Sequence, residues 1–527
     1  MKSWRETVWK VPMIIEKAAE IICRKKYMSA LICGFIAVGA LPPFYVIPCL
    51  FVAFSGIVFL INRLDSKRQA AGAGFLFGFG FFSLGLAWVS NALMIEGMGF
   101  QSLAPLPPLG FGLWGGLFGA AAAVTAACFK KGLRRLTAFS AAWGILEWVR
   151  SWLFTGFPWN LIASVWTDWP AMLQTASVWG AYGLSVVTVF TAGLPALITG
   201  KKEIVKTLLP AVLILLGLFG FGIWRLEKAP APDNTINGVL IRLVQPNIPQ
   251  GTKWSAAEAE QNLMKHVHLS RAAGAEKATH VIWPETATQF LLTDDDFARA
   301  MVTSALTPGS ILLAGSLRRE VNNLEQPAVK MFISIVAMND LGVFLGSYDK
   351  SHLVPFGEYV PLSDMFPFIR KLTPVAMDFS TGGGVRTVII PRTLPVGMLV
   401  CYEVIFPGQV ADKQVRPYWL LNVTNDGWYG LSAGPYQHFA AAQMRAVEEG
   451  LPLARAANTG ICGMIDAYGR VTAFLGLGKQ GIVDAGLPRR TDQPTFYAAY
   501  GNKVPLIFCL ILLIAAAVPD RKTKDLK

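Results

Sequence analysis

The sequence predicts a multi-pass helical membrane domain with a large α/β domain inserted between its seventh and eighth spans. Of the 527 residues, 53% are hydrophobic and only 15% are charged, and the mean hydropathy is +0.44. That composition is unlike that of a soluble protein. Long uncharged runs are confined to residues 28–224 and 504–518. Residues 229–495 have ordinary globular composition and are numerous enough to bury a core of their own.

Eight apolar runs are candidate membrane spans, because several approach the ~20 residues that cross a bilayer and flanking residues extend the shorter ones. In chain order they are Met28–Leu41, Tyr45–Ile61, Ala71–Asn91, Leu106–Phe129, Leu136–Leu153, Val178–Thr199, Leu208–Trp224 and Val504–Val518. The first run is short enough to resemble a signal peptide. However, Pro42-Pro43 leads straight into another apolar run without an A-x-A cleavage site, so we interpret it as a retained span.

The net charge of +13 is explained by membrane topology. Lys and Arg outnumber acidic residues in five short stretches, which are 1–27, 62–70, 130–135, 200–207 and 520–527. The first stretch precedes the first predicted span, and the others follow the second, fourth, sixth and eighth spans. Cytoplasmic loops of membrane proteins carry an excess of Lys and Arg in this way. The pattern places the basic N-terminus (1–27) and the tail (519–527) in the cytoplasm and the 229–495 domain on the outer side. It argues against a nucleic-acid partner.

Ionisable residues are almost absent from the centres of the predicted spans, which argues against a transporter. Glu147 and Arg150 lie three residues apart near the outer end of the fifth span. The favoured interpretation is a local pair whose side chains reach the membrane interface.

Strand-like and helical patterns alternate between residues 229 and 495, which is typical of an α/β domain. The strand-like runs are Val239–Val244, His280–Trp283, Ile311–Ala314, Met331–Ala337, Val343–Leu345, Val396–Val400, Trp419–Val423, Ile461–Ile465, Val471–Phe474 and Ile482–Ala485. The clearest helical patterns are Ser255–Ala273 and Pro435–Glu449. Pairs of neighbouring strands depart from a strict βαβ repeat.

Three of these runs lead to reactive side chains that lie just beyond them, namely Glu285, Lys350 and Cys401. Sites in α/β sheets gather beyond the carboxyl ends of strands, so tertiary structure could bring the three together. A carboxylate can activate a thiol, and an ammonium group can stabilise the oxyanion that follows, which makes a set for acyl transfer. Taken alone, Cys401 is more commonly an inert buried thiol, and a disulfide with Cys462 is a further alternative. His352 could be a second, pH-sensitive base, but we favour a structural role for it.

Three sequence blocks resemble the catalytic blocks of the nitrilase superfamily. They are Trp-Pro-Glu-Thr-Ala (283–287), Asp-Lys-Ser-His-Leu-Val-Pro-Phe-Gly-Glu-Tyr-Val-Pro (349–361) and Cys-Tyr-Glu (401–403). Their wording is closest to the apolipoprotein N-acyltransferase branch. The resemblance continues through residues 425–430, 434–438 and 455–460, and through the span count and the 147–160 segment.

The resemblance implies an α-β-β-α sandwich in which Glu285 is the general base, Lys350 stabilises the oxyanion and Cys401 is the nucleophile. It further implies supporting or substrate-binding roles for a set of four residues. These are Trp254, Glu358, Tyr402 and Glu403. Trp254 could instead be a core residue, and Glu403 could be a structural hydrogen-bond acceptor.

The same resemblance implies the substrates and the compartment. The acyl donor would be a membrane phospholipid and the acceptor the α-amine of a diacylglyceryl-cysteine on an apolipoprotein, in the last step of lipoprotein maturation. The enzyme would lie in the bacterial inner membrane with its 229–495 domain in the periplasm, and it would need no metal and no organic cofactor. The seven cysteines fit this expectation, since they show no CxxC spacing or other metal pattern.

An apolar loop between Leu353 and Ser380 is predicted to enter the outer leaflet and control the entry of acyl chains. Its candidate membrane contacts are Phe356, Phe366, Phe368, Arg370 and Lys371. The alternative is a small buried core. For the whole chain, two other functions are open: a membrane-tethered amidase acting on a small C–N substrate, and a transporter or scaffold with an inert catalytic domain.

Overall fold

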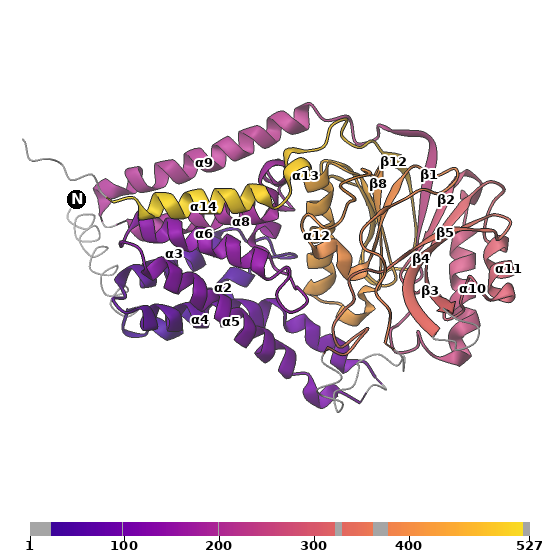
Figure 1. The fold of residues 1–527 in the computed structure, drawn as a ribbon, viewed down its shortest axis with the longest axis horizontal. Coiled ribbons are helices and arrows are strands. Elements are labelled where there is room, and N and C mark those ends of the chain that lie inside the picture. The colour runs from indigo at the N-terminus through magenta and orange to yellow at the C-terminus, as the bar shows by residue number, and fades with distance from the viewer. Residues whose placement is uncertain (1–22, 97–98, 199, 322–328, 362–377, 520–527) are drawn as a thin grey trace, which may run out of the picture.

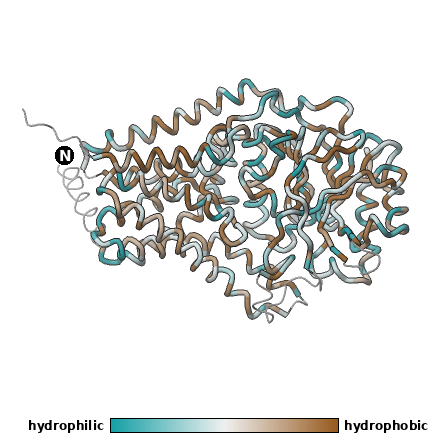
Figure 2. Tube along the Cα trace, in the orientation of Figure 1, coloured by the Kyte–Doolittle hydropathy of each residue, from teal (hydrophilic) through white to brown (hydrophobic). Residues whose placement is uncertain are grey.

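The computed structural model describes residues 23–96, 99–198, 200–321, 329–361 and 378–519, in two regions that lie side by side (Figure 1). One region is helical and holds the N-terminal part of the chain together with the last helix. The other is an α/β sandwich built from the residues between them. Apolar residues dominate the long helices of the first region, whereas the second is mixed along its length (Figure 2).

Each of the eight predicted spans coincides with a helix. The helices are α2 (Lys26–Val38), α3 (Pro48–Arg63), α4 (Lys67–Gly85), α5 (Leu106–Ala127), α6 (Leu133–Val149), α8 (Ala176–Gly193), α9 (Lys201–Glu227) and α14 (Lys503–Ala517). Among the described residues, three helical segments are long and apolar enough to cross a membrane, or four if α4 and the bent 3-10 helix after it, Ala87–Met94, form one span. The helical membrane region is thereby confirmed, while the count of eight spans stays a prediction.

Close contact between α4 and α5 follows from small residues on both helices. An added Cβ on Gly74 would lie 2.3 Å from the Gly119 carbonyl oxygen, and one on Gly78 would lie 2.5 Å from that of Gly115. Glycines four apart on facing helices let two backbones touch, which is how helices gain packing where lipid removes the hydrophobic driving force.

The prediction that Glu147 and Arg150 reach the membrane interface is wrong. Both are buried, and the segment after α6 folds back over them. Glu147 Oε1 accepts hydrogen bonds from Trp143 Nε1 (3.1 Å) and Ile162 N (2.9 Å), while Arg150 Nη1 donates to Trp159 O (2.8 Å). Trp143 is a neighbour on α6, whereas Trp159 and Ile162 belong to the segment that follows, so the pair ties α6 to that segment.

The α/β region contains two six-stranded sheets. The first has the order β12-β1-β2-β3-β4-β5 and the second β11-β10-β9-β8-β7-β6. Their strands are β1 (Thr235–Gln245), β2 (His280–Trp283), β3 (Ile311–Val321), β4 (Val329–Asn339), β5 (Phe344–Asp349), β6 (Thr387–Val388), β7 (Val396–Val400), β8 (Trp419–Thr424), β9 (Leu453–Ala457), β10 (Cys462–Ile465), β11 (Val471–Leu475) and β12 (Gly481–Pro488). The runs β1-β2-β3 and β7-β8-β9 are parallel, and the other pairs are antiparallel.

The sheets lie between helices, as the predicted sandwich requires. Helices α10 (Ala259–Ser270) and α11 (Asp296–Ser304) cover one sheet, and α12 (Ala433–Glu449) lies between the other sheet and the helical region (Figure 1). Alternation along β2 shows the layering: Ile282 joins the core between the sheets, whereas Val281 and Trp283 join the core beneath α10 and α11. The α-β-β-α sandwich is confirmed.

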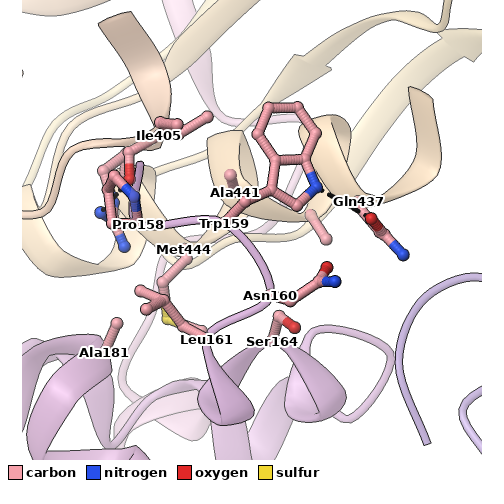
Figure 3. Close-up of a pocket in the computed structure, with 12 residues that line it drawn as sticks. Pro158, Trp159, Asn160, Leu161, Ser164, Ala181, Ile405, Gln437, Ala441 and Met444 are labelled. Carbon is pink, nitrogen blue, oxygen red and sulfur yellow. Dashed lines mark hydrogen bonds between the residues drawn. The ribbon is translucent and has the colours of Figure 1, made fainter. Parts of the chain in front are cut away.

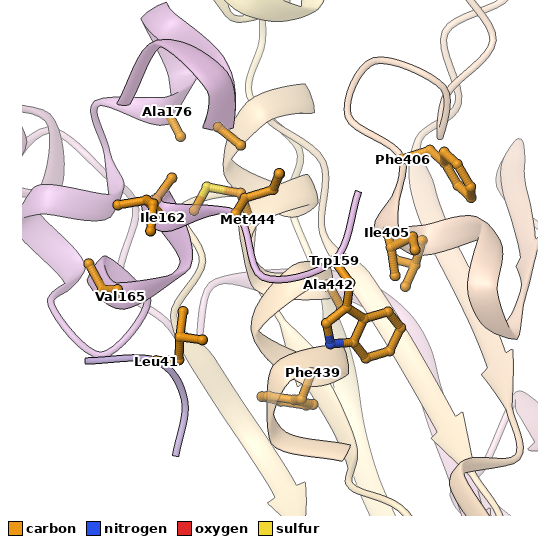
Figure 4. Close-up of a cluster of buried hydrophobic side chains, with 14 of the residues drawn as sticks. Leu41, Trp159, Ile162, Val165, Ala176, Ile405, Phe406, Phe439, Ala442 and Met444 are labelled. Carbon is orange, nitrogen blue, oxygen red and sulfur yellow. The ribbon is translucent and has the colours of Figure 1, made fainter. Parts of the chain in front are cut away.

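One continuous apolar cluster joins the two regions (Figure 4). Leu41, Trp159 and Ile162 come from the helical region, and Phe439 and Met444 come from α12.

Polar contacts at this junction centre on Gln437 of α12. Its Oε1 accepts hydrogen bonds from Trp159 Nε1 (2.8 Å) and Trp88 Nε1 (3.0 Å) beside a cavity of about 30 Å³ (Figure 3). The helix that carries Gln437 is thus fixed to the helical region by both apolar and polar contacts.

Candidate functional site

The three reactive side chains found at strand ends meet in the structure. Glu285 follows β2 and Lys350 follows β5 in one sheet, while Cys401 follows β7 in the facing sheet. Lys350 Nζ lies 3.4 Å from Glu285 Oε1, and the charges of both residues act on the Cys401 thiol. The site therefore lies where the carboxyl ends of strands from two sheets face each other.

Two glycines, which have no side chain, allow the backbone segments that carry Glu285 and Lys350 to pack closely against their neighbours. An added Cβ on Gly315 of β3 would lie 2.5 Å from Glu285 Cα, and one on Gly382 would lie 2.1 Å from the Asp349 carbonyl oxygen. Gly382 N also donates a hydrogen bond to Lys350 O (2.8 Å). The backbone at Glu285 and the backbone just before Lys350 are therefore each packed against a glycine.

Lys350 is fully buried between two carboxylates. Its Nζ lies 2.5 Å from Glu358 Oε1, and Glu358 Oε2 accepts a hydrogen bond from Val354 N (2.8 Å). Burial by itself lowers the pKa of Lys350, but the charges of Glu358 and Glu285 outweigh it and raise that pKa. The amine therefore stays an ammonium group.

Cys401 sits on a strained turn, with φ of 51° in the left-handed region. Two donors hold its carbonyl oxygen: His438 Nε2 at 3.2 Å and Asn422 Nδ2 at 3.3 Å. Burial, and then the charge of Glu285, raises the pKa of the Cys401 thiol to about 12, although Lys350 opposes the shift. The resting thiol is therefore protonated, and a base must act before it becomes a nucleophile.

His438 lies within a buried polar cluster. Its Nε2 donates to the Cys401 carbonyl oxygen, which can only accept, while its Nδ1 lies 2.9 Å from Asp426 Oδ1 and 3.0 Å from Arg455 Nη2. Burial lowers the pKa of His438, and the charge of Asp426 opposes that shift. Asp426 balances Arg455 at 2.8 Å; burial opposes ionisation, but the charge of Arg455 holds the pKa of Asp426 at about 2.

Replacing Arg455 with leucine should destabilise the protein by about 3–5 kcal/mol, since breaking a buried ion pair leaves one charge uncompensated. Both side chains of the pair are fully buried. Thermal unfolding in detergent measures the loss. The double variant Arg455→Leu/Asp426→Asn removes the stranded charge and should recover part of it; equal losses in the two proteins would contradict this account.

Glu403 lies behind the site and accepts five hydrogen bonds. Oε1 takes those of Tyr348 Oη (2.9 Å), Ser351 N (2.7 Å), Ser351 Oγ (2.7 Å) and His352 N (3.1 Å), and Oε2 takes that of Val400 N (2.7 Å). These donors join the residues after Lys350 to the strand before Cys401. The structural reading of Glu403 therefore has geometric support.

Tyr402 and His352 face the helical region. Tyr402 Oη donates to Gly156 O, and its ring stacks on Phe157 with centroids 6.1 Å apart. His352 Nε2 lies 2.7 Å from Thr155 O. A cavity of about 330 Å³ opens here, lined by Thr155, Ser351, His352, Leu353, Tyr359, Asp378, Phe379 and Thr381.

The remaining predicted residues are placed as follows. Trp254 is half-buried, and its Nε1 is buried without a hydrogen-bond partner among the described residues. Phe356 is 45% exposed and has a φ of 61°. The other four residues of the predicted membrane-entering loop, Phe366, Phe368, Arg370 and Lys371, lie outside the described residues. Cys462 and Cys401 are both free thiols.

Sequence reasoning missed Lys253. This lysine is buried, and its Nζ donates to Glu285 O at 3.0 Å. It lies in the loop after β1, the parallel neighbour of β2. Because β1 already ends at Gln245, Lys253 does not directly follow a strand, and the strand-end pattern that singled out Glu285 does not mark it.

Comparison with known proteins identifies the class of the α/β region. Residues 240–495 match the carbon-nitrogen hydrolase family. Among solved structures, a mutant of the amidase from Nesterenkonia sp. AN1 is 18% identical and covers 52% of this chain and 98% of its own, with a TM-score of 0.36.

The match of the helical region, together with matches along nearly the whole chain, identifies the family of the complete protein. Residues 33–194 match the apolipoprotein N-acyltransferase N-terminal domain. The apolipoprotein N-acyltransferase of Brucella melitensis biotype 1 is 36% identical over 96% of this chain and 98% of its own length. That of Agrobacterium fabrum is 37% identical over 93% and 94%. The chain belongs to the apolipoprotein N-acyltransferase family, which confirms the predicted resemblance.

Proposed function

We propose that this protein transfers a fatty acyl chain from a membrane phospholipid to the N-terminal amine of a diacylglyceryl-cysteine on apolipoproteins. The observation that carries the proposal is the meeting of Glu285, Lys350 and Cys401 at three strand ends, with the protonated thiol facing a carboxylate and an ammonium group. Family membership over nearly the whole chain supports the substrates.

In the first half-reaction, Glu285 takes the proton from Cys401 Sγ, and the thiolate attacks the ester carbon of the phospholipid. The carbonyl oxygen gains negative charge, which the Lys350 ammonium group and the backbone N–H after Cys401 stabilise. The C–O bond then breaks, Glu285 returns its proton to the glycerol oxygen, and a lysophospholipid leaves. The acyl chain remains on Cys401 as a thioester.

In the second half-reaction, the acceptor amine loses a proton to Glu285 and attacks the thioester carbon. The C–S bond breaks, and Cys401 recovers a proton from Glu285, so the enzyme returns to its initial state. Glu358 holds Lys350 in place through the 2.5 Å contact, and Glu403 fixes the turn that carries Cys401. Trp254 and Tyr402 would border the substrate.

The proposed setting is the bacterial inner membrane, crossed by eight helices, with both termini in the cytoplasm and the catalytic domain in the periplasm. Alternating basic stretches support this topology. Attachment of α12 to the helical region through Gln437 would hold the site close to the bilayer, where both substrates lie. The loop with Phe356 would then admit acyl chains from the outer leaflet.

A two-stage experiment with the unmodified protein tests this function. Purified enzyme in detergent receives a phospholipid with a labelled acyl chain, and mass spectrometry of its peptides should find that chain on Cys401 as a hydroxylamine-sensitive adduct. Adding a diacylglyceryl-cysteine peptide should remove the label from the enzyme and yield an N-acyl peptide. Release of free fatty acid alone, with the acceptor unmodified, would favour a hydrolytic amidase and overturn the proposal.

A further inference from the structure

The carbonyl oxygen of Cys401 is held by two side chains that come later in the chain. His438 Nε2, on α12, donates a hydrogen bond to it at 3.2 Å, and Asn422 Nδ2, on β8, donates at 3.3 Å. All three residues are buried. A buried carbonyl group that receives two side-chain hydrogen bonds has a fixed direction, because turning it away would break both of them.

Both donors are themselves oriented by Arg455 of β9. Arg455 Nη1 donates to Asn422 Oδ1, so the amide nitrogen of Asn422 faces β7 and the turn after it. Arg455 Nη2 lies 3.0 Å from His438 Nδ1, and Asp426 Oδ1 lies 2.9 Å from the same ring atom. These contacts engage one nitrogen of the ring and leave Nε2 for the Cys401 oxygen.

The peptide group after Cys401 passes this orientation to the next N–H. A peptide group is planar and trans, so its N–H points away from its C=O. The Cys401 carbonyl faces α12, which lies on the side of the second sheet toward the helical region (Figure 1). Glu285 and Lys350 come from the first sheet, on the other side. The Tyr402 N–H is therefore directed toward the sheet that carries the other two reactive groups.

We propose that His438 and Asn422 are positioning residues for the acyl transfer proposed above, on which this inference rests. By holding the Cys401 carbonyl, they aim the Tyr402 N–H at the place where the substrate carbonyl oxygen gains negative charge. The opposite peptide orientation would present the Cys401 oxygen there, and it would repel the oxyanion. The φ of 51° at Cys401 makes such contacts necessary, since a strained backbone persists only where its surroundings hold it. Neither side chain gives or takes a proton.

Two reactions of Cys401, measured on the full-length protein in detergent, separate the aim of this N–H from the position of the thiol. Acylation by p-nitrophenyl butyrate passes through an oxyanion, and the first release of nitrophenolate gives its rate. Alkylation by iodoacetamide displaces iodide without forming an oxyanion, and peptide mass spectrometry gives its rate. Neither reagent is a phospholipid, so a wrong acyl donor in the proposed function leaves this comparison intact.

His438→Asn and His438→Gln form a matched pair. The asparagine amide reaches the place of Nδ1 but not that of Nε2 and loses the Cys401 contact, whereas the longer glutamine amide keeps a donor at the place of Nε2. His438→Asn should be acylated about tenfold more slowly than wild type, as expected for one lost hydrogen bond, while its alkylation rate stays within about twofold. His438→Gln should recover acylation to within about threefold of wild type.

Asn422→Leu removes the second donor with little change in size and should show the same split between the two reactions. Thermal unfolding identifies the folded variants, and if His438→Asn does not fold, Asn422→Leu carries the test alone. Equal slowing of acylation and alkylation in a folded variant would mean that these side chains only place the thiol or support packing. That result, or wild-type acylation rates in the folded variants that lack a donor, would overturn the proposal.

Discussion

Replacing Cys401 with alanine should abolish formation of the acyl-enzyme from a labelled phospholipid. The variant lacks the only atom in the proposed mechanism that can carry the acyl chain, so the expected loss is complete, not a fraction of the rate. Stability should fall little, because Cys401 is a small side chain on a strained turn and its carbonyl contacts with His438 and Asn422 survive the change. Mass spectrometry of the intact protein after incubation with phospholipid measures the result.

Cys462→Ala is the matched control. This thiol is also free and fully buried in the α/β region, but its Sγ contacts the backbone of Ala457, on β9. Burial raises the pKa of Cys462 to about 12, as it does for Cys401, so burial alone does not separate the two. The control should acquire the label at the wild-type rate. Label on the Cys401→Ala protein would show that another group carries the acyl chain.

The parts of the fold that sequence reasoning located well are those with a strong local pattern. The bounds of β2 and β7 match the predicted runs His280–Trp283 and Val396–Val400 residue for residue. Both are short buried strands of mostly apolar residues, and a proline, Pro284 or Pro395, lies at one end of each. Because Glu285 and Cys401 stand at or just beyond those ends, the candidate site was visible from the same signal.

Other elements depend on tertiary partners. Strand β9 was missed because Leu453–Ala457 is rich in alanine and contains Arg455, which reads as a polar position. In the structure the strand is fully buried, and Asp426 supplies the charge that makes an arginine tolerable there. Helix α11 was missed as well, since nine residues give too short a pattern for a confident assignment.

The same dependence explains why the composition of the site was predicted more completely than its surroundings. Glu285, Lys350 and Cys401 each follow a strand, but the 3.4 Å between Lys350 and Glu285 arises from the close approach that Gly315 and Gly382 permit. Lys253 contacts a main-chain oxygen, a partner that no sequence pattern encodes. The two donors to the Cys401 carbonyl oxygen, Asn422 and His438, lie on β8 and α12, which come later in the chain.

Replacing Lys350 with methionine should slow acyl-enzyme formation by a factor of about 10²–10³, because the proposed mechanism makes Lys350 an oxyanion-stabilising group and removing one such group has an effect of this size. It should also destabilise the protein, because Glu358 and Glu285 would be left buried without the cation that lies 2.5 and 3.4 Å from them. Quenched single-turnover reactions measure the first effect, and thermal unfolding measures the second.

The loss of stability should depend on pH in a definite direction. Burial already raises the pKa of Glu358 in the wild type, and Lys350 opposes that shift. Removing the lysine raises this pKa further above its unfolded value. A carboxyl group with a raised folded pKa favours the native state below its unfolded pKa and disfavours it as the pH rises through the folded value. The Lys350→Met protein should therefore lose more stability, relative to wild type, at pH 8 than at pH 5.

The double variant Lys350→Met/Glu358→Gln separates the two roles of the lysine. The glutamine amide at position 358 cannot ionise, so the loss of stability at pH 8 should shrink. Acylation should stay slow, because the proposed tetrahedral intermediate still lacks the ammonium group of Lys350. Recovery of the acylation rate together with stability would mean that Lys350 serves only to hold Glu358. Slow acylation in a double variant of restored stability would instead show that the reaction needs the positive charge of Lys350. That need would then be separate from the contribution of Lys350 to stability.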